Sequence, residues 1–118
     1  MRSEFTIPDF TPRSANEYTF AKVGTRIRKK KGDRDLVAHY AQQSGIPKAT
    51  GKRRISLIVT LAKGGRAVDP DNAWKGLLDG CKQAGLLVND SHKWVELGEY
   101  TIRRGERRST LVILEDVE

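Results

Sequence analysis

The stretch from Arg54 to Ala62, RISLIVTLA, limits the fold most, because it combines β-branched residues with apolar alternation. Its large apolar side chains fall on every second residue from Ile55 to Leu61, and Gly64 then interrupts the run. At nine residues it is far too short to cross a bilayer as a helix. We therefore predict a central β-strand from Arg54 to Ala62.

The hydrophobic period changes from two to 3.6 after Asp71. Four apolar residues then share one helical face and predict a helix from Asp71 to the turn at Gly85, with that face toward the core. Cys81 belongs to this stripe and is expected to be a small buried hydrophobe, not a nucleophile. As the single cysteine it cannot form an internal disulfide. The four residues are Trp74, Leu77, Leu78 and Cys81.

Weaker patterns predict the remaining elements. A first helix is expected from Asp35 to Ser44, where apolar residues recur at helical spacing before a glycine and a proline. Strand-like composition marks Trp94–Arg103 and Ser109–Leu114, and the short turn between them predicts an antiparallel hairpin. Residues 1–33 predict a basic, partly extended N-terminal arm with one short strand from Tyr18 to Val23.

The 118 residues fall within the usual size of one compact domain, so we expect a single domain over 1–118. The order of elements predicts an α+β fold, with two helices and a small mixed or antiparallel sheet. There is no apolar run that could span a membrane and no signal-peptide pattern. A cytoplasmic location is expected, with no membrane partner and no small-molecule cofactor.

The formal charge of +7 is concentrated in a few places. Seven basic residues lie between Lys22 and Arg34 against one acid, and smaller clusters occupy Lys52–Arg54 and Arg103–Arg108. Such surfaces attract polyanions, so nucleic acid is the first partner to consider, although basic residues also serve ordinary solubility. The residues predicted to contact nucleic acid are Arg26, Arg28, Lys29, Lys30, Lys31 and Arg66.

A cluster of acids lies between the predicted strand and the second helix, at Asp69-Pro70-Asp71-Asn72. It places two carboxylates at a helix entrance. The segment is also typical of a turn in which Asp71 or Asn72 caps the helix without further function. Asp90 follows the turn at Gly85, and a chain that returned beside its own helix would bring it near Asp69 and Asp71.

Two more charged residues follow on the flank of the second helix. Lys75 and Asp79 lie three and seven residues after Asn72, so all three share one side of the helix beside the apolar stripe. Asn72 and Asp79 are secondary candidates for the site. The alternative is a solvated helix face with a Lys-Asp pair, which contributes a few tenths of a kcal/mol.

Electrostatics explains why such acids would gather. Two carboxylates about 4 Å apart repel by roughly 4 kcal/mol at an effective dielectric constant near 20. A cation between them removes that penalty, and hard oxygen donors with few histidines favour Mg²⁺, with Mn²⁺ as the alternative. A nearby lysine would stabilise the charge that develops in phosphodiester cleavage.

The stretch from Asp69 to Asp90, DPDNAWKGLLDGCKQAGLLVND, resembles the signature of the RusA family of Holliday junction resolvases. Its register of D-x-D-N, lysine, aspartate and final aspartate matches without a gap, although Asn89 stands where members often carry another acid. The resemblance covers about a fifth of the chain. It implies that Asp69, Asp71 and Asp90 bind Mg²⁺ and that Lys75 assists at the scissile phosphate.

The resemblance also implies a RusA-like fold and a homodimer that resolves four-way or branched DNA by paired symmetric nicks, of a type frequent in phages and prophages. Members of this family are metal-dependent endodeoxyribonucleases. A catalytically silent nucleic-acid-binding module, such as a phage regulator, is the alternative. In that case the acids only cap a helix and the basic residues do all the binding.

Overall fold

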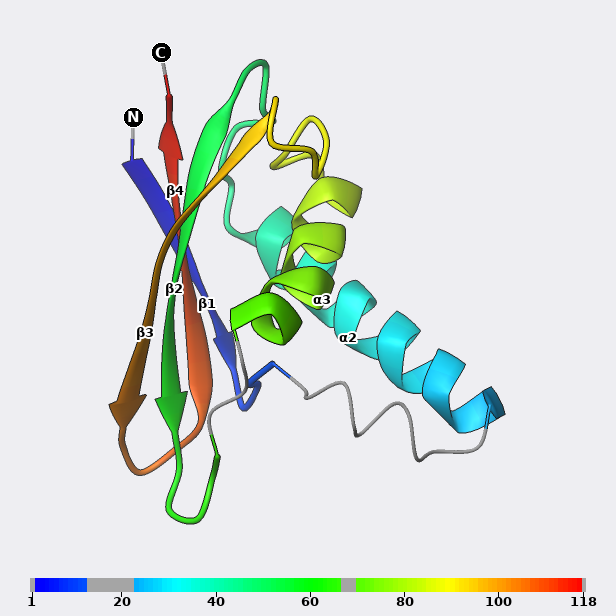
Figure 1. Ribbon diagram of the computed structural model, residues 1–118, viewed down its shortest axis with the longest axis vertical. Coiled ribbons are helices and arrows are strands. Elements are labelled where there is room, and N and C mark those ends of the chain that lie inside the picture. The colour runs from blue at the N-terminus through cyan, green and yellow to red at the C-terminus, as the bar shows by residue number, and fades with distance from the viewer. Residues whose placement is uncertain (1, 13–22, 67–69, 118) are drawn as a thin grey trace.

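The computed structural model describes residues 2–12, 23–66 and 70–117. These form one four-stranded mixed sheet in the order β1-β4-β2-β3, with two helices packed on one of its faces (Figure 1). The predicted α+β fold with two helices is confirmed, and of the two sheet types expected the sheet is the mixed one. The elements are β1 (Arg2–Pro8), α2 (Val23–Gln43), β2 (Arg53–Leu61), α3 (Pro70–Gln83), β3 (Val95–Arg104) and β4 (Ser109–Asp116).

Strands β2 and β3 are parallel and are connected through α3. In such a unit the helix starts from the end of the first strand and leads back to the start of the second. We call the side where β2 and β3 end the carboxyl edge, and the side where they begin the amino edge. The N-terminus of α3 therefore lies toward the carboxyl edge and its C-terminus toward the amino edge (Figure 1).

The predicted antiparallel hairpin of the last two strands is wrong. β4 lies between β1 and β2 and is antiparallel to both, whereas β3 pairs with the opposite side of β2. The connection at 105–108 crosses the end of β2, where Gly105 N donates to Leu61 O at 3.0 Å. β4 buries Val112, Ile113 and Leu114 in succession, which suits an interior strand, and the charged β3 forms an edge.

The predicted N-terminal arm is also corrected. Residues 2–8 form β1, which pairs antiparallel with β4 and directs Phe5 and Ile7 into the core. The basic run that begins at Arg26 lies in α2, which starts twelve residues before the predicted helix at Asp35. In the predicted strand Tyr18–Val23, residues 18–22 lie outside the described part of the chain, and Val23 opens α2.

The core lies between the helices and the sheet. Inward residues of β2 alternate from Ile55 to Leu61, and α3 contributes Trp74, Leu77 and Cys81 of the predicted stripe, while Leu78 is partly buried against it. The two helices approach closely at Gly80, where a Cβ atom would lie 2.5 Å from the Val37 side chain. Within the described residues neither helix has the length and apolar character needed to traverse a membrane.

Candidate functional site

The first turn of α3 carries the acidic motif predicted to bind metal. Pro70 takes the first helical position, where its missing N–H is not needed, and Asp71 and Asn72 follow. The partial positive charge at a helix N-terminus favours acidic residues there. Asp69 lies outside the described residues.

Lys75 and Asp79 continue from this turn on the exposed side of α3. Lys75 lies one helical turn after Asp71, so the two positions are neighbours on the helix surface. The buried neighbours Ala73, Trp74 and Leu77 fix the orientation of the helix against the core. Of the predicted polar flank, Lys75 and Asp79 are therefore both exposed beside the apolar stripe.

Asp90 lies at the other end of the unit. It belongs to the loop between α3 and β3, and Val95 at the end of that loop pairs with Arg53 at the beginning of β2. The 14 residues of α3 span about 20 Å at 1.5 Å per residue. The structure thus places Asp71 at the carboxyl edge and Asp90 at the amino edge, and it does not bring them together within one chain.

The physical reason is the parallel pairing of β2 and β3. We expected the chain to fold back along its helix after Gly85 toward Asp71. In a crossover between parallel strands, the helix instead carries the chain from the end of the first strand back to the level where both strands begin. The loop after the helix then leads directly into the start of the second strand. A short loop cannot return to the helix N-terminus and still begin β3 opposite Arg53.

The loop that carries Asp90 is held by short-range hydrogen bonds. Asp90 N donates to the side-chain oxygen of Asn89 at 2.7 Å, and Ser91 O accepts from Trp94 N and Val95 N at 2.9 and 3.0 Å. The side chain of Asp90 is exposed. The Asn89 side chain therefore takes part in shaping this turn.

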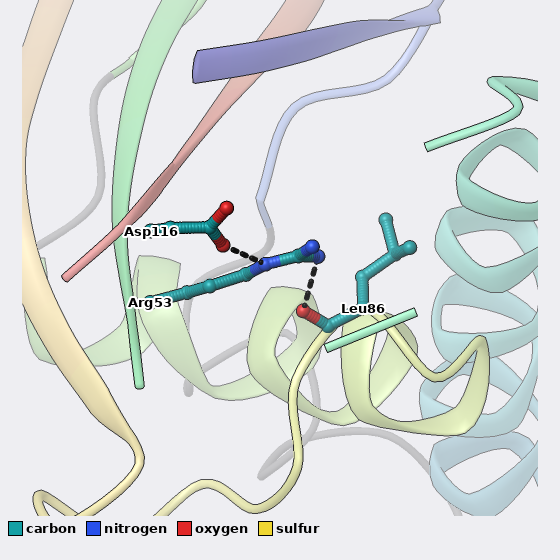
Figure 2. Close-up of polar contacts among 3 residues, drawn as sticks. All are labelled: Arg53, Leu86 and Asp116. Atoms are coloured by element: carbon teal, nitrogen blue, oxygen red, sulfur yellow. Dashed lines mark hydrogen bonds and ion pairs between the residues drawn. The ribbon is translucent and has the colours of Figure 1, made fainter. Parts of the chain in front are cut away.

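Arg53 anchors the segment that leads to this loop. Its structural role was not predicted from the sequence. Its side chain is buried: Nε donates to Asp116 Oδ1 at 2.9 Å and one terminal nitrogen donates to Leu86 O at 3.1 Å (Figure 2). These bonds link the start of β2 to the end of β4 and to the segment leading to Asp90. The sequence did carry a signal for this role. Arg53 lies two residues before Ile55, and because side chains of a strand alternate between its faces, both point to the inward face.

The residues predicted to contact nucleic acid lie on two elements. Arg66 is exposed in the loop that follows β2 at the carboxyl edge. The others, Arg26, Arg28 and Lys29–Lys31, lie along the N-terminal half of α2, which projects beyond the body formed by the sheet and α3 (Figure 1). The basic run is thus helical and not an extended arm.

Among the side chains that the structure describes there is no cluster of three or more His, Cys, Asp or Glu residues that could hold a metal ion. Cys81 is fully buried, and burial raises the pKa of its thiol from 9.0 to about 12. The thiol is therefore neutral at physiological pH and suited to packing, as predicted.

The chain matches no family model, and no curated protein matches it. The likeness to RusA-type resolvases therefore depends on the motif between Asp69 and Asp90 alone.

Proposed function

We propose that this chain is a Mg²⁺-dependent endodeoxyribonuclease of the RusA type that hydrolyses phosphodiester bonds in branched DNA and resolves four-way junctions by paired nicks. The observation that carries the proposal is the entrance of α3, where Asp71 lies in the first turn and the exposed Lys75 follows one turn later. Arg66 precedes this turn on an exposed loop at the same edge.

The donor set suits a hard cation. Carboxylates of Asp69, Asp71 and Asp90 would hold Mg²⁺, because this ion prefers hard oxygen ligands. Once bound, the ion would lower the pKa of a water and neutralise charge on the phosphate. Lys75 would donate to a non-bridging phosphate oxygen and stabilise the extra negative charge of the transition state.

The separation of Asp71 from Asp90 by the length of α3 gives the homodimer a specific role. We infer that each site combines Asp71 of one protomer with Asp90 of the partner subunit, since about 20 Å of helix keeps them apart within one chain. Two such sites would be related by the twofold axis of the dimer. A four-way junction offers two equivalent strands to a twofold enzyme.

The first test is cleavage of a synthetic four-way junction in Mg²⁺. Asp71→Asn is expected to lower the cleavage rate by about 10²-fold or more, because a charge-stabilising ligand is lost at the reacting phosphate. The matched control is Glu99→Gln, which removes an exposed carboxylate on β3 away from the motif and is expected to cut at the normal rate.

Mixing two inactive proteins tests how the site is assembled. If sites form between protomers, a heterodimer of Asp71→Asn and Asp90→Asn contains one site with both carboxylates intact, so an exchanged mixture regains nicking activity. If each site lies within one chain, both halves of the heterodimer stay defective and the mixture stays inactive. Inactivity of the mixture, with dimer exchange verified, would overturn the shared site.

The separation of Asp71 and Asp90 also favours a second candidate, a non-catalytic basic module that binds nucleic acid. In that case Asp71 and Asn72 only cap α3. The same assay distinguishes the two, because the module would bind the junction in both the natural and Asp71→Asn forms and cut it in neither.

A further inference from the structure

Two loops from distant parts of the sequence meet at the carboxyl edge. The first, residues 62–66, follows β2, and the second, residues 105–108, connects β3 to β4 across the end of β2. They are tied together by Gly105 N, which donates to Leu61 O at 3.0 Å, and by Arg104, whose guanidinium donates to Gly65 O at 2.7 Å. The two loops thus form one continuous surface.

This surface is strongly basic, and we call it the carboxyl-edge basic surface. All of its basic side chains are exposed, and across the two loops and the end of β3 Glu106 is the one acid against six cations. Among the residues that the structure describes, none of the six forms an ion pair. The six are Lys63, Arg66, Arg103, Arg104, Arg107 and Arg108.

We propose that the carboxyl-edge basic surface binds the sugar-phosphate backbone of a DNA duplex arm. Unpaired cations held at this density repel one another, and phosphates relieve the repulsion while their condensed counterions are released. Guanidinium groups suit the task because their fork of N–H donors matches two phosphate oxygens. The choice of DNA as the polyanion rests on the proposed function, but the phosphate contact does not depend on cleavage.

The dimensions of the surface fit a duplex. The ends of β4, β2 and β3 are neighbours in the sheet, so at about 4.8 Å between strands they span about 10 Å. A duplex carries one negative charge for each 1.7 Å of axis, roughly, so several phosphates face a span of that length. An acidic protein is a poorer fit, since protein interfaces use aromatic anchors and the segments 62–66 and 103–108 contain none.

The position of the surface links it to the proposed site. Arg66 lies four residues before Pro70, so a backbone held on these loops lies beside the entrance of α3. The basic N-terminal half of α2 projects toward the same end of the molecule (Figure 1). The carboxyl-edge basic surface therefore adds a second set of phosphate contacts to those predicted on α2.

Binding without metal tests this inference, because it separates contact from cleavage. The variant Arg107→Gln/Arg108→Gln removes two charges from the loop at 105–108. Its control, Arg2→Gln/Lys48→Gln, removes two exposed charges away from the carboxyl edge. Affinity is measured by fluorescence anisotropy in EDTA, on a four-way junction and on a linear duplex, across a range of salt concentrations.

We expect the arginine variant to bind both DNAs about tenfold more weakly near 0.1 M salt and to lose about 2 from the slope of log K against log salt, since each phosphate contact contributes about 0.9. The control should lose less than half of its affinity and keep its slope. Equal losses in the two variants, or an unchanged slope, would overturn the inference. A protein that binds as expected but never cuts would instead refute the nuclease proposal alone.

Discussion

The two edges of the parallel strand pair use arginine in opposite ways. At the amino edge Arg53 is 4% exposed and bonded to Asp116 and to Leu86 O, so its charge is satisfied within the fold. At the carboxyl edge Arg107 and Arg108 are exposed and have no ion-pair partner among the described residues. The comparison teaches that pairing and burial, more than residue type, separate arginines that hold the fold from arginines available to a ligand.

The largest expected effect is that of removing the buried arginine. Arg53→Met should lower the free energy of unfolding by about 3 kcal/mol, because the buried Leu86 O would lose its side-chain donor and the half-exposed Asp116 would lose its bond to the same guanidinium. The measurement is urea denaturation. Arg54→Met is the matched control: its side chain is 43% exposed and pairs with Glu96, so the loss should stay below about 1 kcal/mol.

Equal destabilisation of the two variants would contradict the claim that burial and pairing make Arg53 structural. Arg53 and Arg54 are neighbours in β2 and differ in the face of the sheet that they occupy. The alternation of the strand makes this pair a stringent control.

Alkylation of Cys81 measures the stabilising effect of Arg53 without denaturant. Its buried thiol, with a pKa near 12, should resist alkylation at pH 8 to 9 in the native protein, whereas an unfolded thiol with an ordinary pKa of 9.0 ionises there and reacts. Raising the pH within this range should therefore speed alkylation only of those molecules that have transiently unfolded and exposed the thiol. Where opening is reversible and fast, Arg53→Met should increase the alkylation rate about 100-fold, the equivalent of about 3 kcal/mol.

Rapid labelling of the native protein at a rate independent of stability would show that Cys81 is reached through local motion of α3. A rate that follows the unfolding free energy across variants would support its place in the cooperative core.

The smallest expected effect is that of the exposed arginines on stability. Arg107→Gln/Arg108→Gln should change the free energy of unfolding by no more than about 0.5 kcal/mol, because exposed and unpaired side chains contribute little to the fold. The measurement is the same urea titration. A loss as large as that of Arg53→Met would mean that these arginines support the loop structure, and the distinction between the edges would fail.

The elements with strong periodicity were predicted closely. β2 was expected at Arg54–Ala62 and α3 from Asp71, within one residue of their observed starts, because each carries an apolar face that the core requires. β1 was missed although Phe5 and Ile7 alternate, since Pro8 and Pro12 suggested an arm. The N-terminal half of α2 was missed because its charged residues carry no apolar repeat.

Strand pairing could not be predicted from local signals. The turn at 105–108 looks like that of a hairpin, yet the order of strands depends on which strand is paired along both of its sides. This is settled by β1, which is far from β4 in the sequence and pairs with it. The same error affected the site. Without knowing that β2 and β3 are parallel, the sequence could not show that Asp71 and Asp90 lie at opposite edges.

The interior position of β4 has a consequence for how the protein is made. β1 is synthesised before its partner β4, and residues 9–108 separate the two strands, so β1 must wait unpaired while that stretch is translated. β2 waits as well, with one side open until β4 arrives. The nascent protein thus exposes the unpaired backbone of β1 and of one side of β2 to chaperones. A pause in translation before Ser109 would prolong that exposure.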